Sequence, residues 1–124
     1  MQFTKALIAA LSFVAVQAIT GDLTYYNAAL GACGETHGDN DYVVAIGHDL
    51  YDTATVGTNP NNNAYCGKQI KATLPATGKT VTVTVVDRCT GCTNNDLDFA
   101  GGAWRDITND AAPTRFSGLE WNWV

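Results

Sequence analysis

The stretch that decides the fold runs from residue 79 to residue 92 and reads Lys79-Thr-Val-Thr-Val-Thr-Val-Val-Asp-Arg-Cys-Thr-Gly-Cys92. Its valines at 81, 83 and 85 alternate with threonines at 80, 82 and 84. A period of two puts the two sets of side chains on opposite faces of an extended chain, and β-branched residues favour strands. We therefore predict a half-buried strand over residues 79–87, followed by a turn that ends at Cys92.

Further strand signals lie on both sides of this segment. Alternation of Leu119, Trp121 and Trp123 predicts a strand near the C-terminus, and weaker patterns occur at 23–27, 42–46 and 69–74. The best helix candidate spans residues 98–107, with Asp98 as a candidate N-cap and two glycines that weaken it. We expect five or six short strands and one or two short helices. Short strands in so small a chain bury little core unless the sheet closes, so we predict a β-rich barrel.

The N-terminus has the organisation of a secretory signal peptide. Residues 1–18, MQFTKALIAALSFVAVQA, combine one cation, an apolar run and a small residue at Ala18. A membrane anchor is the alternative, but the apolar run is well short of the roughly 20 residues that span a bilayer. We predict a signal peptide over residues 1–18, one domain over residues 19–124, and a secreted, extracellular protein.

The four cysteines at 33, 66, 89 and 92 are an even number in a chain expected in an oxidising compartment. Two disulfides are therefore expected, with three pairings open. We favour Cys33–Cys66 with Cys89–Cys92, because the first closes a long loop and the second stiffens a turn. A redox pair and half of a zinc site are the alternatives for Cys89 and Cys92, but a four-cysteine zinc site needs two close pairs.

Charge and composition exclude several partners. Seven Lys and Arg face twelve Asp and Glu, which gives a net charge of −5. Such a chain is poorly suited to phosphate neutralisation, so nucleic acid and anionic membranes are not expected partners. His37 and His48 have no nearby second ligand at metal-binding spacing, so we expect no metal and no cofactor. No extended apolar seam is present, and we expect a monomer.

Two carboxylates could carry chemistry. Asp87 ends the strongest predicted strand, and Asp98 follows beyond the cysteine turn, so both can face one opening of a barrel. Two nearby carboxylates repel, which can raise one pKa until that group acts as a general acid, as glycosidic cleavage requires. The structural alternatives are a helix cap for Asp98 and a surface position or an Arg88 pair for Asp87.

Aromatic side chains are numerous for so short a chain, and flat rings stack well on sugar rings. Core packing is the favoured interpretation for Trp121 and Trp123, which lie at strand spacing. Tyr25 and Tyr26 point to opposite faces of one strand, so at most one joins a given groove. We select Tyr26 and Trp104 as candidate substrate-binding residues.

Five motifs in order resemble the double-psi β-barrel superfamily: Leu23-Thr-Tyr-Tyr26, Gly31-Ala-Cys-Gly34, Cys66-Gly-Lys-Gln-Ile70, Val85-Val-Asp-Arg-Cys-Thr-Gly-Cys92 and Asp96-Leu-Asp98. Within it, they are most similar to fungal single-domain expansin-like proteins of the loosenin type, and to the barrel domain of rare lipoprotein A and plant expansins. The resemblance covers about residues 21–124. It implies a six-stranded double-psi β-barrel.

The resemblance also implies site residues. In that family a threonine of the first strand and two aspartates line a polysaccharide groove, and they correspond to Thr24, Asp87 and Asp98. This chain departs from the family pattern beside the second aspartate, with Asp96 in place of a histidine and Phe99-Ala100 in place of Leu-Ser. The related family-45 endoglucanases use another aspartate near the first strand, where this chain has Asn27-Ala28.

Three functions follow from these observations. The resemblance favours an expansin-like protein that binds insoluble cell-wall polysaccharide, of cellulose or chitin type, and loosens it without hydrolysis. One alternative is a protein-binding module, either a cysteine-protease inhibitor or an effector, which would use exposed loops such as residues 57–63. The other is a weak glycoside hydrolase or lytic transglycosylase, against which the missing aspartate counts.

Overall fold

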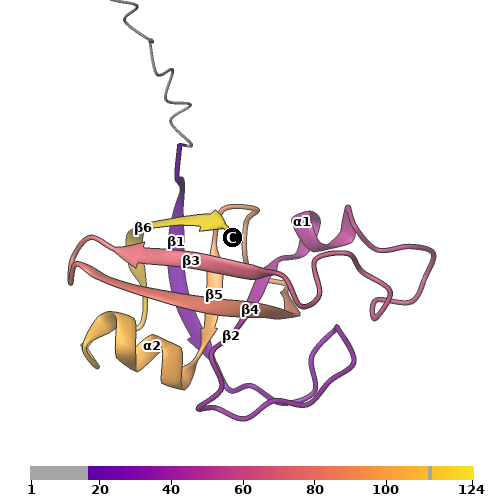
Figure 1. Ribbon diagram of the computed structural model, residues 1–124, viewed down its shortest axis with the longest axis horizontal. Coiled ribbons are helices and arrows are strands. Elements are labelled where there is room, and N and C mark those ends of the chain that lie inside the picture. The colour runs from indigo at the N-terminus through magenta and orange to yellow at the C-terminus, as the bar shows by residue number, and fades with distance from the viewer. Residues whose placement is uncertain (1–16, 112) are drawn as a thin grey trace, which may run out of the picture.

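The computed structural model describes residues 17–111 and 113–124, which form a closed six-stranded barrel with two short helices (Figure 1). Residues 1–16 of the predicted signal peptide lie outside the described residues. In chain order the elements are β1 (Ile19–Tyr26), β2 (Val43–Gly47), α1 (His48–Asp52), β3 (Gln69–Leu74), β4 (Lys79–Cys89), β5 (Leu97–Ala100), α2 (Gly101–Thr108) and β6 (Phe116–Trp123).

The strand order around the barrel is β1-β5-β2-β4-β3-β6, and β6 pairs with β1 to close it. The pairs β1·β5 and β2·β4 are parallel, whereas the other four pairs are antiparallel. Closure gives every strand two neighbours and leaves no sheet edge open. The predicted barrel is confirmed. Neither described helix is long and apolar enough to cross a membrane.

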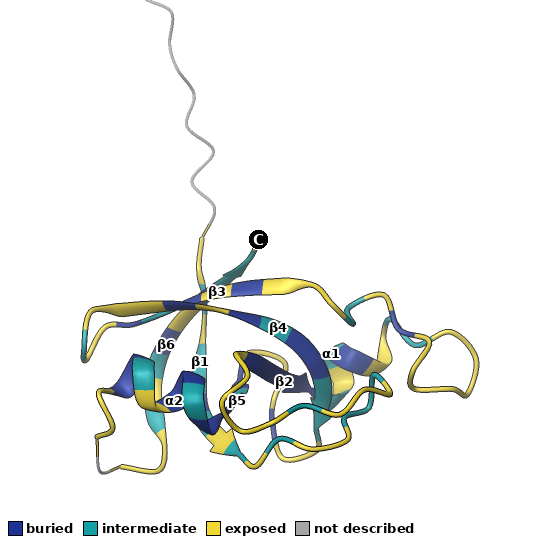
Figure 2. Ribbon diagram, turned by 60° about the horizontal axis from the view of Figure 1, so that its bottom comes forward, coloured by how far each residue is buried: buried dark blue, intermediate teal, exposed yellow. Residues whose placement is uncertain are grey.

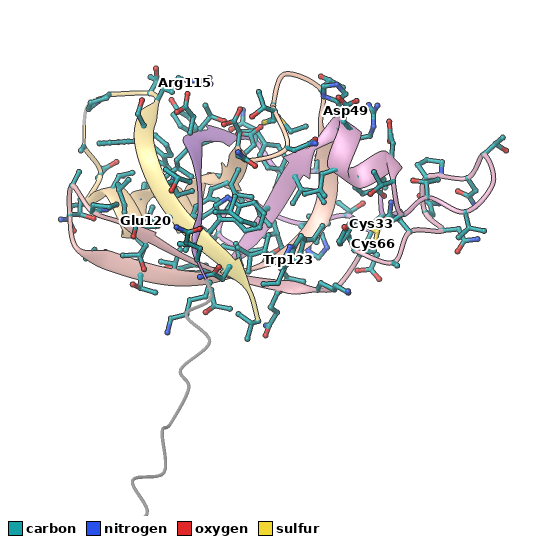
Figure 3. The ribbon with its side chains drawn as sticks, turned by 90° about the horizontal axis from the view of Figure 1, so that it is seen from above. Cys33, Asp49, Cys66, Arg115, Glu120 and Trp123 are labelled. Carbon is teal, nitrogen blue, oxygen red and sulfur yellow. A yellow bond between two sulfur atoms is a disulfide. The ribbon has the colours of Figure 1, made fainter. Side chains whose placement is uncertain are left out.

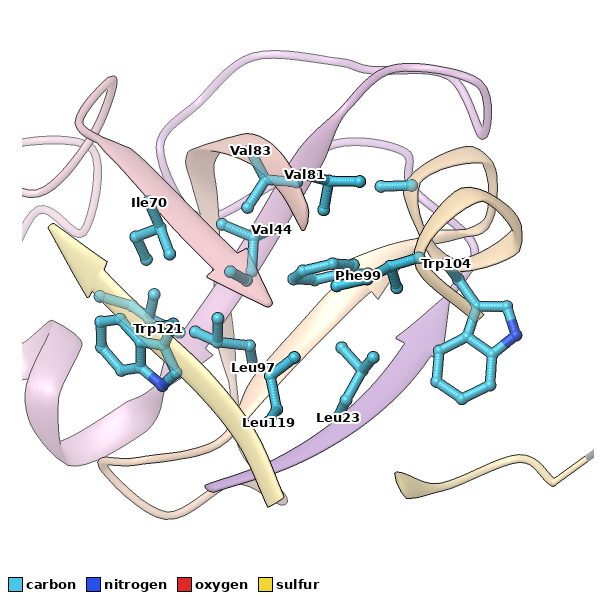
Figure 4. Close-up of a cluster of buried hydrophobic side chains, with 14 of the residues drawn as sticks. Leu23, Val44, Ile70, Val81, Val83, Leu97, Phe99, Trp104, Leu119 and Trp121 are labelled. Atoms are coloured by element: carbon cyan, nitrogen blue, oxygen red, sulfur yellow. The ribbon is translucent and has the colours of Figure 1, made fainter. Parts of the chain in front are cut away.

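The interior is filled by the residues that the alternation of β4 and β6 predicted. Val81, Val83 and Val85 of β4 are buried, and Trp121 of β6 is 1% exposed. Figure 4 shows several of these side chains meeting Leu23 and Phe99 inside the barrel. Figure 2 shows that the buried positions follow the strands, while exposed positions dominate the connecting loops. Burial of these side chains, at about 1.5–3 kcal/mol each, is the main source of stability.

The predicted helix over residues 98–107 is wrong at its start. Asp98 lies in β5, and α2 begins at Gly101 after the N-cap position at Ala100. Strand pairing on both sides outweighs the local helix signal, because Asp98 pairs with Thr24 of β1 and with Ala45 of β2. The first amides of α2 are capped from a distant loop instead, since Gly101 N donates to Asp39 Oδ1 and Gly102 N donates to Asp39 O.

Both favoured disulfides are present, Cys33–Cys66 and Cys89–Cys92. Cys33–Cys66 ties the loop after β1 to the segment before β3 (Figure 3). The Tyr51 hydroxyl lies 3.4 Å from Cys66 Sγ and donates to Pro60 O at 2.6 Å. The first bridge therefore belongs to a packed unit, whereas the second closes a four-residue turn at the end of β4.

The segment from Cys89 to Asp96, here called the cysteine loop, is fixed against the barrel at its C-terminal end. Asp96 accepts hydrogen bonds from Asp22 N and Thr93 N, both at 2.9 Å. Trp121 Nε1 donates to Asn95 O at 2.8 Å. A Cβ at Gly21 would overlap that same carbonyl oxygen, so this contact requires glycine. The loop is thus set by side-chain and backbone contacts beyond its disulfide.

We predict that Gly21→Ala lowers the free energy of unfolding by about 1–3 kcal/mol or more, because the added methyl forces the cysteine loop off β1. Urea unfolding at constant pH measures this change. Gly91→Ala is the matched control, since nothing lies within 4 Å of its added Cβ, and its effect should stay within about 0.5 kcal/mol. Equal losses in the two variants would contradict the proposed anchoring.

Candidate functional site

Strand β5 brings Asp98 beside Thr24. The two residues face each other in the parallel β1·β5 register, and Thr24 Oγ1 donates to Asp98 Oδ1 at 2.9 Å. Among the described residues, only Thr24 donates a side-chain hydrogen bond to this carboxylate. The second carboxylate oxygen therefore remains able to accept a hydrogen bond from a ligand.

Asp98 lies in an open hollow of about 370 Å³, here called the Asp98 hollow. The cysteine loop forms one side, and the C-terminal part of β1 and Arg115, which directly precedes β6, form the others. Its lining residues are Thr24, Tyr25, Arg88, Cys89, Thr90, Gly91, Cys92, Asp96, Asp98 and Arg115. Polar groups dominate this lining, which suits a hydroxylated ligand better than an apolar one.

The environment of Asp98 makes its carboxyl group harder to ionise than that of a free aspartate. Burial raises the pKa of this carboxyl, the hydrogen bond from Thr24 acts in the opposite direction, and the negative charge of Asp87 raises the pKa further. The net direction is upward from 3.8. A carboxyl with a raised pKa in an open hollow is a candidate for binding or proton transfer.

Asp87 and Tyr26, the other predicted site residues near Asp98, do not line the Asp98 hollow. Asp87 Oδ1 accepts from Ala32 N at 2.9 Å and from Arg88 N at 2.8 Å, so the carboxylate fixes backbone of the loop after β1. Tyr26 is partly buried, and burial with the charges of Asp87 and Asp98 raises its pKa. The three groups form a cluster in which only Asp98 reaches the hollow.

Two arginines at the rim are already paired. Arg88 makes a bidentate contact with Asp52, with both nitrogen–oxygen distances at 2.8 Å. Arg115 Nε donates to Asp22 Oδ2 at 2.8 Å. Because each guanidinium has an acidic partner, neither gives the hollow a strong net positive charge, and both retain N–H groups for neutral acceptors.

Asp96 lines the hollow too, but its two oxygens are used within the protein. Burial opposes its ionisation, while hydrogen bonds from Asp22 and Thr93 and the charge of Arg115 lower its pKa overall. The sequence placed Asp96 where the resembling family has a histidine. The structure gives it an anchoring role in the cysteine loop.

Of the aromatic residues near the site, the structure exposes Tyr25 more than the predicted Trp104. Trp104 is 5% exposed and packs between Tyr25 and Phe116, with ring centroids 4.8 Å and 5.6 Å apart. Tyr25 is 45% exposed and lines the Asp98 hollow, so it is the accessible aromatic ring of the site. Strand alternation does not predict that Tyr25 is accessible. Leu23 lies on the same face of β1 and is buried inside the barrel, whereas Tyr25 lies near the end of the strand and contacts Trp104 of α2.

Tyr25 also lines a second hollow of about 270 Å³, here called the α2 hollow. Its lining residues are Tyr25, Asn27, Asp39, Gly101, Trp104, Arg105, Asp110, Ala111, Pro113 and Thr114. They come from β1, the loop before β2, α2 and the segment before β6. Of these residues only Trp104 was selected from the sequence, as a candidate substrate-binding residue; the others carry no local pattern and converge only after folding.

Three potential metal ligands meet at the Asp98 hollow. Ligand atoms of Cys89, Cys92 and Asp98 lie within 4.8 Å of one another. The two sulfur atoms are bonded to each other, however, and a disulfide does not supply the thiolates that bind zinc. We assign no metal to this group.

Substitution of Asp98 is expected to stabilise the protein. Because its pKa in the folded state lies above 3.8, ionisation of Asp98 opposes folding, and wild-type stability falls as the pH rises through that pKa. Asp98→Asn should therefore unfold at a higher urea concentration than the wild type at pH 7. The difference should disappear at pH values below 3.8.

Asp96→Asn provides the matched comparison, with the opposite sign. The lowered pKa of Asp96 means that its ionised form stabilises the fold above 3.8, and this contribution is lost as the pH falls through the lowered value. Asp96→Asn should therefore be less stable than the wild type at pH 7, with a smaller difference in acid. Shifts of the same sign in both variants at pH 7 would contradict these assignments.

Comparison with known proteins identifies relatives for the whole barrel. The family model described as "Barwin family" matches residues 16–120. The "Allergen Asp f 7 homolog" of Arthroderma benhamiae is 35% identical over 120 residues, which are 85% of this chain and 38% of that protein. The "Papain inhibitor" of Streptomyces mobaraensis is 29% identical over 113 residues, 87% of this chain and 73% of that protein. The chain thus spans little more than a third of the allergen homologue.

Solved structures share the architecture. The Streptomyces papain inhibitor aligns with a TM-score of 0.70 and 29% identity, covering 87% of this chain and 94% of that chain. An apo expansin of Clavibacter michiganensis aligns with a TM-score of 0.63 and 27% identity, covering 86% of this chain and 50% of that one. A variant of that expansin, 24% identical, was solved in complex with cellohexaose, with the same TM-score of 0.63. The chain belongs to the Barwin family, and its fold is a double-psi β-barrel.

Proposed function

We propose that this is a secreted protein of expansin-like type that binds a cell-wall polysaccharide in the Asp98 hollow and loosens chain packing without hydrolysis. The observation that carries the proposal is the Asp98 carboxylate, held at one oxygen by Thr24 with its other oxygen available in an open polar hollow. A hydroxyl of a sugar is a suitable donor to that oxygen, and a charge-assisted hydrogen bond of this kind contributes about 1.5–3 kcal/mol.

The relatives support a glycan ligand. The expansin of Clavibacter michiganensis, of which this chain covers half, has a variant solved with cellohexaose. A carboxylate and exposed aromatic surface from Tyr25 occur together in the Asp98 hollow. In the proposed mechanism Asp98 accepts a hydroxyl hydrogen bond that would otherwise join two polysaccharide chains, so binding competes directly with chain–chain contact.

The positions of the carboxylates argue for binding rather than hydrolysis. Inverting glycosidases need two carboxyl groups about 6.5–9.5 Å apart on opposite sides of the scissile bond. Asp87 does not line the Asp98 hollow, and its Oδ1 accepts two backbone hydrogen bonds. Beyond β1 the chain presents Asn27, whose amide cannot act as a general base. Asp96 also lines the hollow, but both of its oxygens accept backbone hydrogen bonds. Asp98 would therefore act alone, as a hydrogen-bonding group.

We predict that insoluble cellulose or chitin depletes the protein from solution at pH 7 with no release of reducing sugar. The panel should include chitosan, xylan and peptidoglycan. Asp98→Asn and Thr24→Val should weaken adsorption about tenfold or more, since each alters the carboxylate contact. Asp106→Asn, at a partly exposed aspartate that lines neither hollow, is the charge-matched control. Adsorption of all variants at wild-type strength would overturn the site assignment.

A second function is favoured by a different surface. The segment from Thr55 to Asn63, here called the Asn loop, is exposed from residue 56 to residue 62, whereas Thr55 is partly buried and Asn63 is buried at its base. The Asn63 side chain donates to Tyr51 O at 2.6 Å and Thr55 Oγ1 at 2.9 Å, and it accepts from Tyr65 N at 2.8 Å. A loop held in this way loses little entropy on binding. Since a relative is a papain inhibitor, we propose the Asn loop as the contact with a papain-like protease.

Papain inhibition tests this second function directly. Val56 is 65% exposed on the Asn loop, and Val56→Asp should weaken inhibition about tenfold or more by placing an unpaired charge in the interface. Leu30→Asp is the control, because Leu30 is 70% exposed but lies outside the Asn loop. If excess wild-type protein leaves papain activity unchanged, the proposed inhibition is wrong. If both variants lose inhibition equally, the Asn loop is not the inhibitory surface.

A further inference from the structure

The Asp98 hollow and the α2 hollow are neighbours along the same surface. Tyr25 lines both, and the adjacent residues Thr114 and Arg115 line one hollow each. The Trp104 ring of α2 packs on the Tyr25 ring, with the two ring centroids 4.8 Å apart, and this contact holds the Tyr25 ring between the hollows. The two hollows therefore form one trough with an aromatic ring between its two parts.

The α2 hollow has the composition of a site for a sugar ring. Exposed surface of Tyr25 and the ring of Pro113 offer apolar contacts to the C–H groups of a pyranose. Asn27 and Asp110 add exposed polar groups around them. Small-ligand sites in general combine such apolar surface with a few convergent polar groups.

The charges of the α2 hollow restrict its ligand. Arg105 donates to Asn40 Oδ1 at 2.9 Å and contacts Asp39 Oδ2 at 3.4 Å, so its guanidinium is partly neutralised. Asp110 is exposed, and no described cation pairs with it. The remaining negative charge disfavours uronate or sulfated sugars, whereas an uncharged sugar avoids this repulsion.

We propose that the α2 hollow is a second subsite of the polysaccharide groove and takes an uncharged hexopyranose residue of the chain whose neighbouring part lies over Asp98. Tyr25 then lies between the two subsites and contacts the polymer across both. This inference rests on the proposed glycan-binding function. It adds a minimum ligand length and a preference for uncharged sugars.

Oligosaccharides of increasing length test the second subsite. Titration calorimetry with the mono-, di-, tri- and hexasaccharides of β-1,4-linked glucose and N-acetylglucosamine should show a rise in affinity once the ligand reaches both hollows. Tyr25→Ala, Asn27→Ala and Asp110→Asn should each reduce hexasaccharide affinity about three- to tenfold and leave short-ligand affinity over Asp98 less affected. Asp110→Asn suits the left-handed backbone at that position, where φ is 55°.

Tyr42→Ala is the matched control for Tyr25→Ala, since Tyr42 is 43% exposed and lines neither hollow. Amide resonances supply a readout independent of affinity. The hexasaccharide should shift the signals of Asn27, Gly101 and Arg105, whereas a disaccharide confined to the Asp98 hollow should shift Thr24 and Asp98. A uronate hexamer should shift neither group.

Each outcome separates the inference from the proposed function. Suppose that affinity rises with ligand length, that the three α2-hollow variants leave it unchanged, and that amide shifts occur only around Asp98. This result would overturn the second subsite but would leave the Asp98 site standing. Strong binding of the uronate hexamer in the α2 hollow would overturn the preference for uncharged sugars. Failure of the wild type to bind any of these glycans, soluble or insoluble, would overturn both proposals.

Discussion

The site depends on the carboxylate of Asp96, which fastens the cysteine loop to the barrel. Its oxygens accept from Asp22 N on β1 and from Thr93 N within the loop. The next residue begins β5, a strand of only four residues that lies between β1 and β2 in the barrel and carries Asp98. The position of Asp98 therefore follows from Asp96, and the clearance that Gly21 provides for Asn95 is part of the same constraint.

The two aspartates that flank Leu97 have opposite electrostatic environments. Backbone amides lower the pKa of Asp96 despite its burial, whereas burial and the charge of Asp87 raise the pKa of Asp98 despite the hydroxyl of Thr24. Asp96 directly precedes β5 and Asp98 is the second residue of that strand, and both residues line the Asp98 hollow. One is satisfied within the fold and the other retains an open acceptor, which is the division expected when stability is given up at a functional position.

Alternation of apolar and polar residues in the sequence predicted those strands that bury one face and expose the other. Alternation located β4, β6 and the main core residues, and cysteine number and spacing favoured the observed disulfides. The sequence patterns missed β5 and assigned residues 98–100 to the start of a helix, because a strand of four residues followed by two glycines has too little periodicity to be recognised. Its strand conformation comes from pairing with β1 and β2, which are distant in sequence.

The exposure of the aromatic residues also depends on contacts between segments that are distant in sequence. Trp104 becomes part of the core and Tyr25 becomes accessible because α2 packs on the end of β1, a contact between distant segments. The α2 hollow is lined by residues of α2, and the Asn loop projects beyond α1 on the other side of the barrel (Figure 1). No residue of the Asn loop lines either hollow, so the two proposed functions would use different side chains of one barrel, and a substitution in one surface need not affect the other.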